Sequence, residues 1–435
     1  MDAVRSTHLW FLVLLVFAAN LVSATLFIGR IHKPVGDDNV NMVDVRLYVA
    51  HGVSAASIRS QTNPPGPLGF VWMAEGVRLL GGDDLRDARL AALFSWVLTV
   101  SAVLLLSRYT GFQNVWLGAL LVLLAFPHTV ESMTLVLTEG PALFFATVGV
   151  LLWVESATRE TTTTASQLFM IGGGLSMGLA VVCRQYYLAL LPAAGLFALF
   201  HSTKRGRSWW ASVVASLITA VLPAILLVAI WKGVTSPGMA TGTSYENWRA
   251  AAGLNFFRPV VAAFYAAFYL LLLTFPVMSA LKPALRWRPL ALALAIGLVF
   301  GSRSDRILQP GPLRTALHFA ARHSSIALFA LFGLIAAATA YNTIALGSFL
   351  WERRSIFRAS PLLTFGLLFV AFFIAEQVGV GGNLFLYERY TLQLAPFLGV
   401  VAFSAFPRLT YPRLLVLAAM LMVSHVMLWR SALGG

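Results

Sequence analysis

The strongest constraint on this chain is a succession of apolar segments, each bounded by a short polar loop. A membrane-spanning helix needs about 20 apolar residues, and a soluble domain usually carries about a quarter charged residues. Here 59% of the residues are hydrophobic and only 11% are charged. The pattern therefore predicts an all-α polytopic membrane protein with about 13 transmembrane helices. These lie at about 10–29, 90–106, 115–126, 135–154, 168–182, 188–200, 211–231, 260–281, 290–301, 326–350, 362–374, 392–406 and 414–429.

No polar stretch is long enough to form a separate soluble domain, so residues 1–435 are predicted to be a single membrane domain. We interpret the first apolar segment as a retained signal anchor. The net charge of +14 is typical of Lys and Arg retained in cytoplasmic loops, and we expect no nucleic-acid partner. The single cysteine, Cys183, excludes an internal disulfide and a thiolate metal cluster.

The positions of the basic loops predict how the chain is oriented. If the N-terminus is cytoplasmic, the basic loops near 201–210, 282–288, 351–358 and 407–413 fall inside, as the positive-inside rule requires. The first acidic loop and the polar loops near 127–141, 232–258 and 376–389 then fall on the opposite, outer face. Loop 302–323 is an exception, because its arginines would lie outside. Either the segment before it does not span, or these arginines serve a function.

The first polar loop, about residues 30–88, is the candidate active-site loop. It contains Asp37, Asp38, Asp44 and Tyr48, and its sequence Asn63-Pro64-Pro65-Gly66-Pro67 leads back to the membrane. Residues 68–80 are apolar but short and carry Glu75 and Arg78, which favours an interfacial helix. Proline before proline fixes an extended path, so the loop can hold a carboxylate at a set depth. We predict that Asp44 is the general base, although a solvated loop acid or helix cap would look the same.

Further candidate substrate ligands stand at the outer ends of later segments. Glu139 precedes Gly140-Pro141, where an acid also serves as an ordinary helix-start residue. Arginine binds phosphate bidentately, but at an interface it can equally extend toward water. The candidates are Tyr48, Glu139, Arg184, Gln185, Arg303, Arg306, Glu388, Arg389 and Tyr390.

No metal-binding motif is evident in the sequence. It contains no HExxH motif and no phosphate-binding glycine loop. Asp37 and Asp38 form one pair that is able to contact a divalent cation, which is a weak signal. We therefore predict no defined metal site and keep a divalent cation as the one candidate cofactor.

The order of these landmarks resembles the GT-C class of integral-membrane glycosyltransferases, in particular the branch of aminoarabinose and protein mannosyl transferases. Members carry an Asp-Glu-x-x-Tyr motif in the first outer loop. Asp44 and Tyr48 match it, whereas Val45 stands in place of Glu. A Pro-Pro motif follows, with Asn63 where His is common. Glu139 before a proline, Arg184 at a break, and Arg389-Tyr390 before Pro396 are also similar to that family.

This resemblance implies transfer of a sugar from a polyprenyl-phosphate donor to a lipid, glycan or protein acceptor on the outer face. It implies that Asp44, with Asp37 or Asp38 as substitutes, activates the acceptor hydroxyl. It also implies that arginines such as Arg184 and Arg389 hold the leaving phosphate. We expect an active site that faces outward from a bacterial plasma membrane.

The main alternative is a transporter or flippase of a lipid-linked or anionic solute. Such a protein usually places charged residues within the membrane interior. Here the apolar segments are almost free of charge, and the acids and arginines gather at one predicted face. Glycan polymerases and non-catalytic scaffolds fit less well, since the early acidic loop is the richest in polar groups.

Overall fold

The computed structural model describes residues 6–63, 66–159, 163–201, 205–238, 254–278, 287–309, 311–322, 324–352, 360–379 and 388–433. Within these ranges the regular structure is entirely helical. Pro64, Pro65 and most of the predicted 232–258 and 376–389 loops lie outside the described residues.

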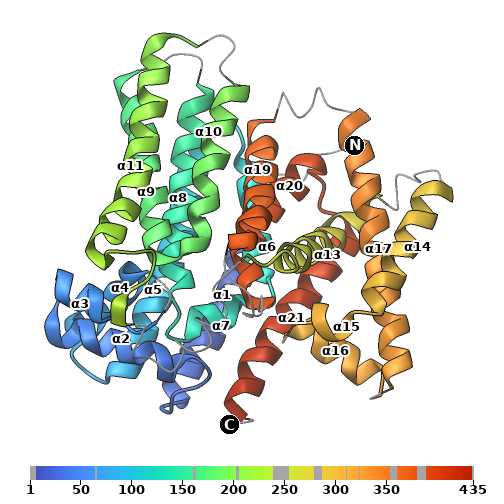
Figure 1. The fold of residues 1–435 in the computed structure, drawn as a ribbon, viewed down its shortest axis with the longest axis horizontal. Coiled ribbons are helices and arrows are strands. Elements are labelled where there is room, and N and C mark those ends of the chain that lie inside the picture. Colours follow the sequence, from blue (N-terminus) through green and yellow to red (C-terminus); the bar gives the residue numbers. More distant parts are fainter. Residues whose placement is uncertain are drawn as a thin grey trace.

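The first half of the chain supplies the helices on the left of Figure 1 and those behind its centre. They are α1 (Ser6–Arg30), α2 (Asp38–His51), α3 (Ala55–Ser60), α4 (Pro67–Leu80), α5 (Asp84–Leu106), η1 (Ser107–Tyr109), α6 (Gln113–Ala125), α7 (Thr129–Thr134), α8 (Glu139–Thr158), α9 (Thr164–Cys183), η2 (Gln185–Ala189), α10 (Leu190–Phe200) and α11 (Arg207–Trp231).

The second half supplies the central and right-hand helices. They are α13 (Arg258–Met278), α14 (Trp287–Gly301), α15 (Ser304–Ile307), α16 (Pro312–Ala320), α17 (Ser325–Glu352), α19 (Pro361–Glu376), η5 (Gln377–Gly379), η6 (Glu388–Leu394), α20 (Ala395–Ala405) and α21 (Tyr411–Leu433).

Helices long and apolar enough to cross a membrane confirm the predicted fold class. Eight described helices meet both criteria, so the predicted number of 13 is not confirmed. Each of the 13 predicted segments contains a helix, but several are short. Helix α20, for example, has 11 residues, which rise only about 17 Å. Breaks at the ends account for the short helices. The 3-10 helix η6 directly precedes α20 and takes the place of its first turns, and Pro127 stands just beyond the end of α6.

The predicted start of the fourth span needs a correction. The hydrophobic run begins at Leu135, but α8 begins at Glu139, and residues 135–138 form a short link after the helix α7. Main-chain groups of Val136 in this link bond to side chains of α2, so the link serves to attach the first polar loop. Hydrophobicity alone gives no signal for this use.

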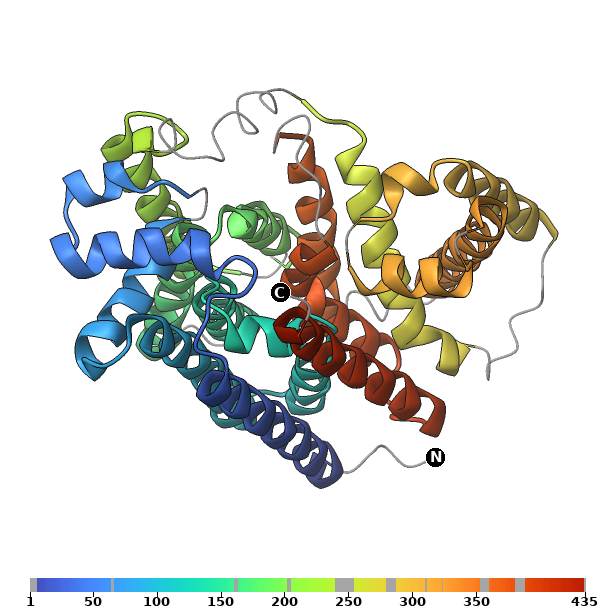
Figure 2. The ribbon, with the colours of Figure 1, turned by 90° about the horizontal axis from the view of Figure 1, so that it is seen from below.

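The short helices gather at one end of the bundle, which we call the site face. Figures 1 and 2 show α2, α3, α7, α15 and α16 together at this end. The start of α1 lies at the other end, because Trp10 contacts Arg108, which follows the far end of α5. The predicted interfacial helix is α4, which begins with Pro67 and ends at the left-handed Gly81. Its buried face packs on α2 and α5 through Phe70, Met73 and Val77.

Candidate active site

The first polar loop is attached to the bundle by Asp38. Its carboxylate pairs with Arg89 of α5 at 2.6 Å and accepts the Val35 and Val136 main-chain N–H groups at 3.0 and 2.7 Å. Both charged side chains are essentially inaccessible, at 0% and 1% exposure. A buried pair that is also hydrogen-bonded on its remaining atoms holds one geometry. Asp38 therefore fixes where the loop leaves α1 and enters α2.

Asp44 lies one turn and a half further along α2 and is also fully buried. Its carboxylate accepts the main-chain N–H groups of Thr62 and Asn63 at 2.8 and 2.9 Å. The Thr62 hydroxyl and the Asn63 amide donate to it as well, at 3.1 and 2.6 Å. Burial raises the pKa of Asp44 and these hydrogen bonds oppose the rise. The described contacts of Asp44 thus hold the segment that leads into Asn63-Pro64.

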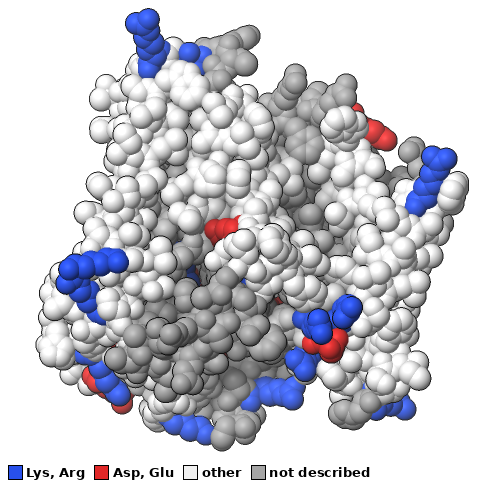
Figure 3. Space-filling view, in the orientation of Figure 1, with Lys and Arg blue, Asp and Glu red and all other residues white. Residues whose placement is uncertain are grey.

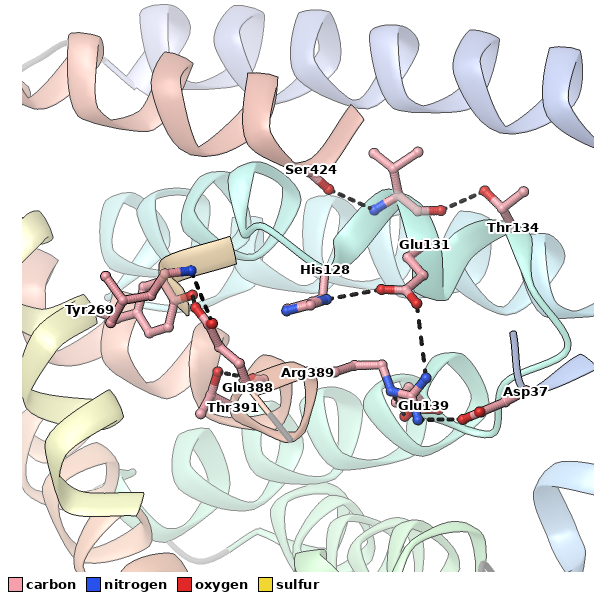
Figure 4. A network of polar contacts seen from close by, with 12 residues as sticks. Asp37, His128, Glu131, Thr134, Glu139, Tyr269, Glu388, Arg389, Thr391 and Ser424 are labelled. Atoms are coloured by element: carbon pink, nitrogen blue, oxygen red, sulfur yellow. Dashed lines mark hydrogen bonds and ion pairs between the residues drawn. The ribbon is translucent and has the colours of Figure 1, made fainter. Parts of the chain in front are cut away.

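Asp37 is the accessible acid of the three. Its side chain is 47% exposed, and its Oδ2 atom lies 2.5 Å from the Nη2 atom of Arg389. This contact joins the start of the first polar loop to η6, more than 350 residues later in the chain. Figure 4 shows Asp37 entering from the edge of the network toward the guanidinium.

Three carboxylates surround the Arg389 guanidinium. Besides Asp37, Glu139 approaches its Nε atom at 3.6 Å and Glu131 approaches Nη1 at 3.9 Å. Burial would lower the pKa of Arg389, but Glu139, Asp37 and Glu131 raise it. A guanidinium is always charged, and the Arg389 side chain is mostly covered, with 15% of it exposed.

A second arginine shares Glu139 with Arg389. Arg184, the residue after α9, forms an ion pair with the same Oε1 atom of Glu139. The guanidinium carbons of Arg184 and Arg389 lie 5.7 and 5.8 Å from the centre of the Tyr390 ring. Two guanidinium groups thus converge on one acid and one aromatic ring.

A third arginine, Arg258, extends this cationic side of the site. It stands at the start of α13 and donates from Nη2 to the Tyr186 hydroxyl at 3.0 Å and from Nε to Gln377 at 2.9 Å. The Tyr186 ring lies 5.3 Å from that of Tyr390. The tyrosine pair therefore links Arg258 with the two arginines around Glu139.

Glu388 points away from Arg389. It is fully buried, accepts the Tyr269 hydroxyl at 2.5 Å and accepts the Leu313 main-chain N–H at 3.2 Å. Burial raises the pKa of Glu388. Figure 4 shows it on the side of η6 opposite Glu139, so its described contacts connect η6 with α13 and α16.

The remaining predicted residues lie around or outside this network. The Tyr48 hydroxyl is buried and donates to Gln61 at 2.9 Å, behind the loop. Gln185 is exposed beside Arg184. Arg303 and Arg306 are exposed near α15, and neither makes an ion pair with a described acid. The structure thus brings together Asp37, Glu139, Arg184, Arg389 and Tyr390 from the predicted set.

Three residues of the network were not predicted to take part. They are Glu131, His128 and Arg258. His128 Nδ1 lies 2.9 Å from Glu131 Oε2, and the two are three residues apart, on one face of a helical turn. Burial would raise the pKa of Glu131, but the His128 contact and Arg389 hold it below the usual value. His128 and Glu131 follow Pro127 at a helix end, which is a sequence signal, whereas Arg258 follows a loop and has none.

A pocket of about 390 Å³ opens beside the first polar loop. Its walls come from the loop itself, α2 and the start of α5, and include His32, Asn39, Arg46, Asp83 and Asp84. No group of three or more His, Cys, Asp or Glu side chains in the described ranges is placed to hold a metal ion.

The sequence model of the dolichyl-phosphate-mannose-protein mannosyltransferase family matches residues 68–235. No curated protein sequence matches the chain significantly. Among solved structures, the Cupriavidus metallidurans ArnT bound to undecaprenyl phosphate is 17% identical with a TM-score of 0.42, over 95% of this chain and 77% of that one.

Two other solved structures are similar at the same distant level. The Saccharomyces cerevisiae Pmt1-Pmt2 protein O-mannosyltransferase complex bound to the sugar donor is 15% identical with a TM-score of 0.41, and the match covers 57% of this chain and 36% of that one. The Archaeoglobus fulgidus oligosaccharyltransferase AglB, in complex with an inhibitory peptide and a dolichol-phosphate, is 14% identical with a TM-score of 0.38, over 96% and 56%. The family match over residues 68–235 confirms the resemblance to GT-C glycosyltransferases that the sequence predicts.

Proposed function

We propose that this protein is a membrane glycosyltransferase that moves a sugar from a polyprenyl-phosphate donor to an acceptor at the site face. The main structural support is the contact between the half-exposed Asp37 and Arg389. It places an accessible carboxylate next to a cation that other carboxylates hold in position. The family match over residues 68–235 supports the reaction class.

The two arginines around Glu139 fit the phosphate of such a donor. In the reaction the acceptor oxygen bonds to the anomeric carbon of the sugar, and the bond from that carbon to the phosphate oxygen breaks. The phosphate leaves with the electron pair, and negative charge grows on its oxygens. Arg389 and Arg184 are the described cations nearest to Asp37 and Glu139, and preorganised cations stabilise such developing charge.

The acceptor hydroxyl must lose its proton to a base as it attacks. The sequence places Asp44 first for this role, while the contacts favour Asp37. All the hydrogen bonds described for Asp44 come from Thr62 and Asn63, and Asp38 is enclosed with Arg89. Asp37 alone of the three has a substantially exposed carboxylate. We therefore assign the base to Asp37 and give Asp44 and Asp38 the task of holding the loop.

The donor is a lipid, which explains why the site lies at the end of a helical bundle. A polyprenyl chain reaches the site laterally through the bilayer while its phosphate stays at the level of the headgroups. From the resemblance we also expect that the site faces outward and that the acceptor is a lipid, a glycan or a protein. Tritiated mannose, glucose and aminoarabinose on polyprenyl phosphate are suitable probes for the sugar.

The decisive experiment compares Asp37→Asn with Asp44→Asn, two changes that each remove one carboxylate charge. Purified protein in detergent is given the labelled lipids and a membrane extract as the acceptor source. We expect Asp37→Asn to lose turnover by about 10²–10⁴-fold, the usual contribution of a general base, while donor binding remains.

Asp44→Asn distinguishes the two assignments. If it keeps the wild-type melting temperature but loses turnover, and Asp37→Asn stays active, Asp44 is the base and our assignment is wrong. If the wild type binds the labelled lipids yet releases no sugar from any of them, the transporter alternative replaces the transferase.

A further inference from the structure

The segment from Arg303 to Arg322 carries a basic surface outside the network described above. It contains four arginines, at 303, 306, 314 and 322, and one acid, Asp305. All four arginines are exposed, and none forms an ion pair with an acid of the described chain. We call these arginines together with Phe319 the α15–α16 patch. Figure 3 shows basic side chains gathered at this place, over the position of α15 and α16 in Figure 1.

An exposed aromatic ring accompanies this charge. The Phe319 side chain is 86% exposed, and Ile326 at the start of α17 is 79% exposed. Helix α16 buries Leu313 and Leu317, which are four residues apart, against the protein. It therefore lies along the surface with one apolar face packed and Phe319 projecting elsewhere. Water is a poor environment for this ring, and a soluble anion leaves it uncovered.

The patch also lies at a defined depth relative to the ends of the apolar helices α14 and α17. Arg303 is two residues beyond the end of α14, and Arg322 is three residues before α17 begins. Two or three residues of chain span at most about 7–11 Å, so both arginines lie near the apolar helix ends, at the level of lipid headgroups.

The neighbouring helix pair is suited to contact with acyl chains. Helices α14 and α17 pack closely, and an added methyl at Gly297 would meet the Gly333 carbonyl oxygen at 2.5 Å. Their outward side chains include Leu298 and Leu334, each 64% exposed. Acyl chains can therefore lie against this pair directly below the arginines.

We propose that the α15–α16 patch binds the headgroups of anionic phospholipids in the leaflet at the site face. The arginines contact the phosphate groups, and Phe319 lies among the first carbons of the acyl chains. A lipid interface offers negative charge and apolar contact at the same depth. Binding to anionic lipids also explains why loop 302–323 carries arginines on the predicted outer face, against the positive-inside rule. These arginines attach α15 and α16 to the membrane.

The test uses the full chain in nanodiscs that contain photoactivatable phosphatidylglycerol or photoactivatable phosphatidylcholine at equal mole fraction. Crosslinked peptides are measured by mass spectrometry. In the wild type we expect phosphatidylglycerol to label the 303–322 peptides several-fold more than phosphatidylcholine, with about fivefold preference for each arginine that contributes. The double variant Arg303→Gln/Arg306→Gln should lose most of this preference.

A matched control removes two arginines from the same face that already have acidic partners. Arg46 pairs with Asp84 at 3.4 Å and Arg78 pairs with Glu75 at 2.6 Å. Arg46→Gln/Arg78→Gln should keep the preference for phosphatidylglycerol at 303–322. Phe319→Ser should lower labelling by both lipids, because it removes the apolar contact.

Several results would overturn the proposal. Equal labelling by the two lipids in the wild type would exclude headgroup recognition, and an unchanged preference in Arg303→Gln/Arg306→Gln would exclude these arginines. Loss of preference in the control variant would indicate a general effect of charge. Displacement of the label by inorganic phosphate would identify a soluble-anion site, and displacement by a trace of dolichyl phosphate would identify a substrate site. Retained labelling under both competitors supports a bulk-lipid surface.

Discussion

At the scale of single residues, the site depends on how one guanidinium is held among several carboxylates. Arg389 contacts Asp37 through Nη2, approaches Glu131 through Nη1 and approaches Glu139 through Nε. Each nitrogen has a different partner, so the planar group has one preferred orientation. A point charge on a flexible stem cannot make this set of contacts.

Arg389→Lys should therefore lower kcat/KM for the labelled donor by at least about tenfold, although the charge is kept. The same substitution at the exposed Arg46, whose side chain is 63% exposed, should leave the rate within about twofold of the wild type. Steady-state release of labelled sugar measures both. Equal rates for Arg389→Lys and the wild type would show that only the charge at this position matters.

The Glu131 carboxylate should make stability depend on pH. Its pKa is held below the ordinary value of 4.5 by His128 and Arg389, despite burial. A group with a lowered folded pKa contributes stability above its unfolded pKa and loses it as the pH falls through the folded value. The wild type should thus lose melting temperature below about pH 4.5, and Glu131→Gln should lose less over the same window.

Thermal unfolding followed by tryptophan fluorescence in detergent, between pH 6 and pH 3, measures this difference. The exposed Glu75 is a suitable comparison, since its partner Arg78 lies on the same helix at the surface. Glu75→Gln should follow the wild-type curve. Identical curves for Glu131→Gln and the wild type would show that Glu131 has no depressed pKa.

At the scale of elements, a close approach between the first polar loop and α9 places the loop beside Arg184. The Gly66 N–H donates to the Cys183 carbonyl oxygen at 3.2 Å. A methyl added at Gly66 would meet the Val182 carbonyl oxygen at 1.8 Å, which is backbone and cannot rotate away. The glycine of the Pro-Pro-Gly-Pro sequence is therefore required by space, since its φ of −65° suits any residue.

Gly66→Ala should lower the free energy of unfolding by about 1–3 kcal/mol, as overpacking usually does. The melting temperature and the donor turnover should both fall with it. Gly172→Ala is the matched control, because nothing lies within 4 Å of a methyl at that position in α9. It should be neutral or slightly stabilising, as alanine favours helix by up to about 1 kcal/mol over glycine. If Gly66→Ala retains the wild-type melting temperature and turnover, the close approach to α9 does not hold the loop.

At the scale of the whole molecule, the site face should lie outside the cell and the opposite end inside. Cys183 is completely buried, so the wild-type chain should give no background with a thiol reagent. Ser302→Cys places an exposed thiol just before α15, at the site face. Arg207→Cys places one at the start of α11, and this start is at the other end because the last residues of α11 contact α3. We expect a membrane-impermeant maleimide to label only Ser302→Cys in intact cells and both variants after lysis. Labelling of Arg207→Cys alone in intact cells would reverse the orientation.

The amino-acid sequence was sufficient to predict the membrane class, the approximate helices, and the presence of acids and arginines at the helix ends. These properties follow from local composition: an apolar run of sufficient length forms a helix in lipid, and charge stays outside it. The same reasoning identified Asp37, Glu139, Arg184 and Arg389 as candidates, because polar residues beside such runs are costly unless they are used.

The packing of the helices, and not the sequence, shows which of these residues meet and which acid stays accessible. Asp37 and Arg389 are more than 350 residues apart in sequence, and Asp44 differs from Asp37 in having every described contact inside the loop. Spacing along the chain carries no information about such long-range contacts or about burial. Both depend on how η6, α8 and the first polar loop pack together, and this packing decides whether a carboxylate supports the fold or faces a substrate.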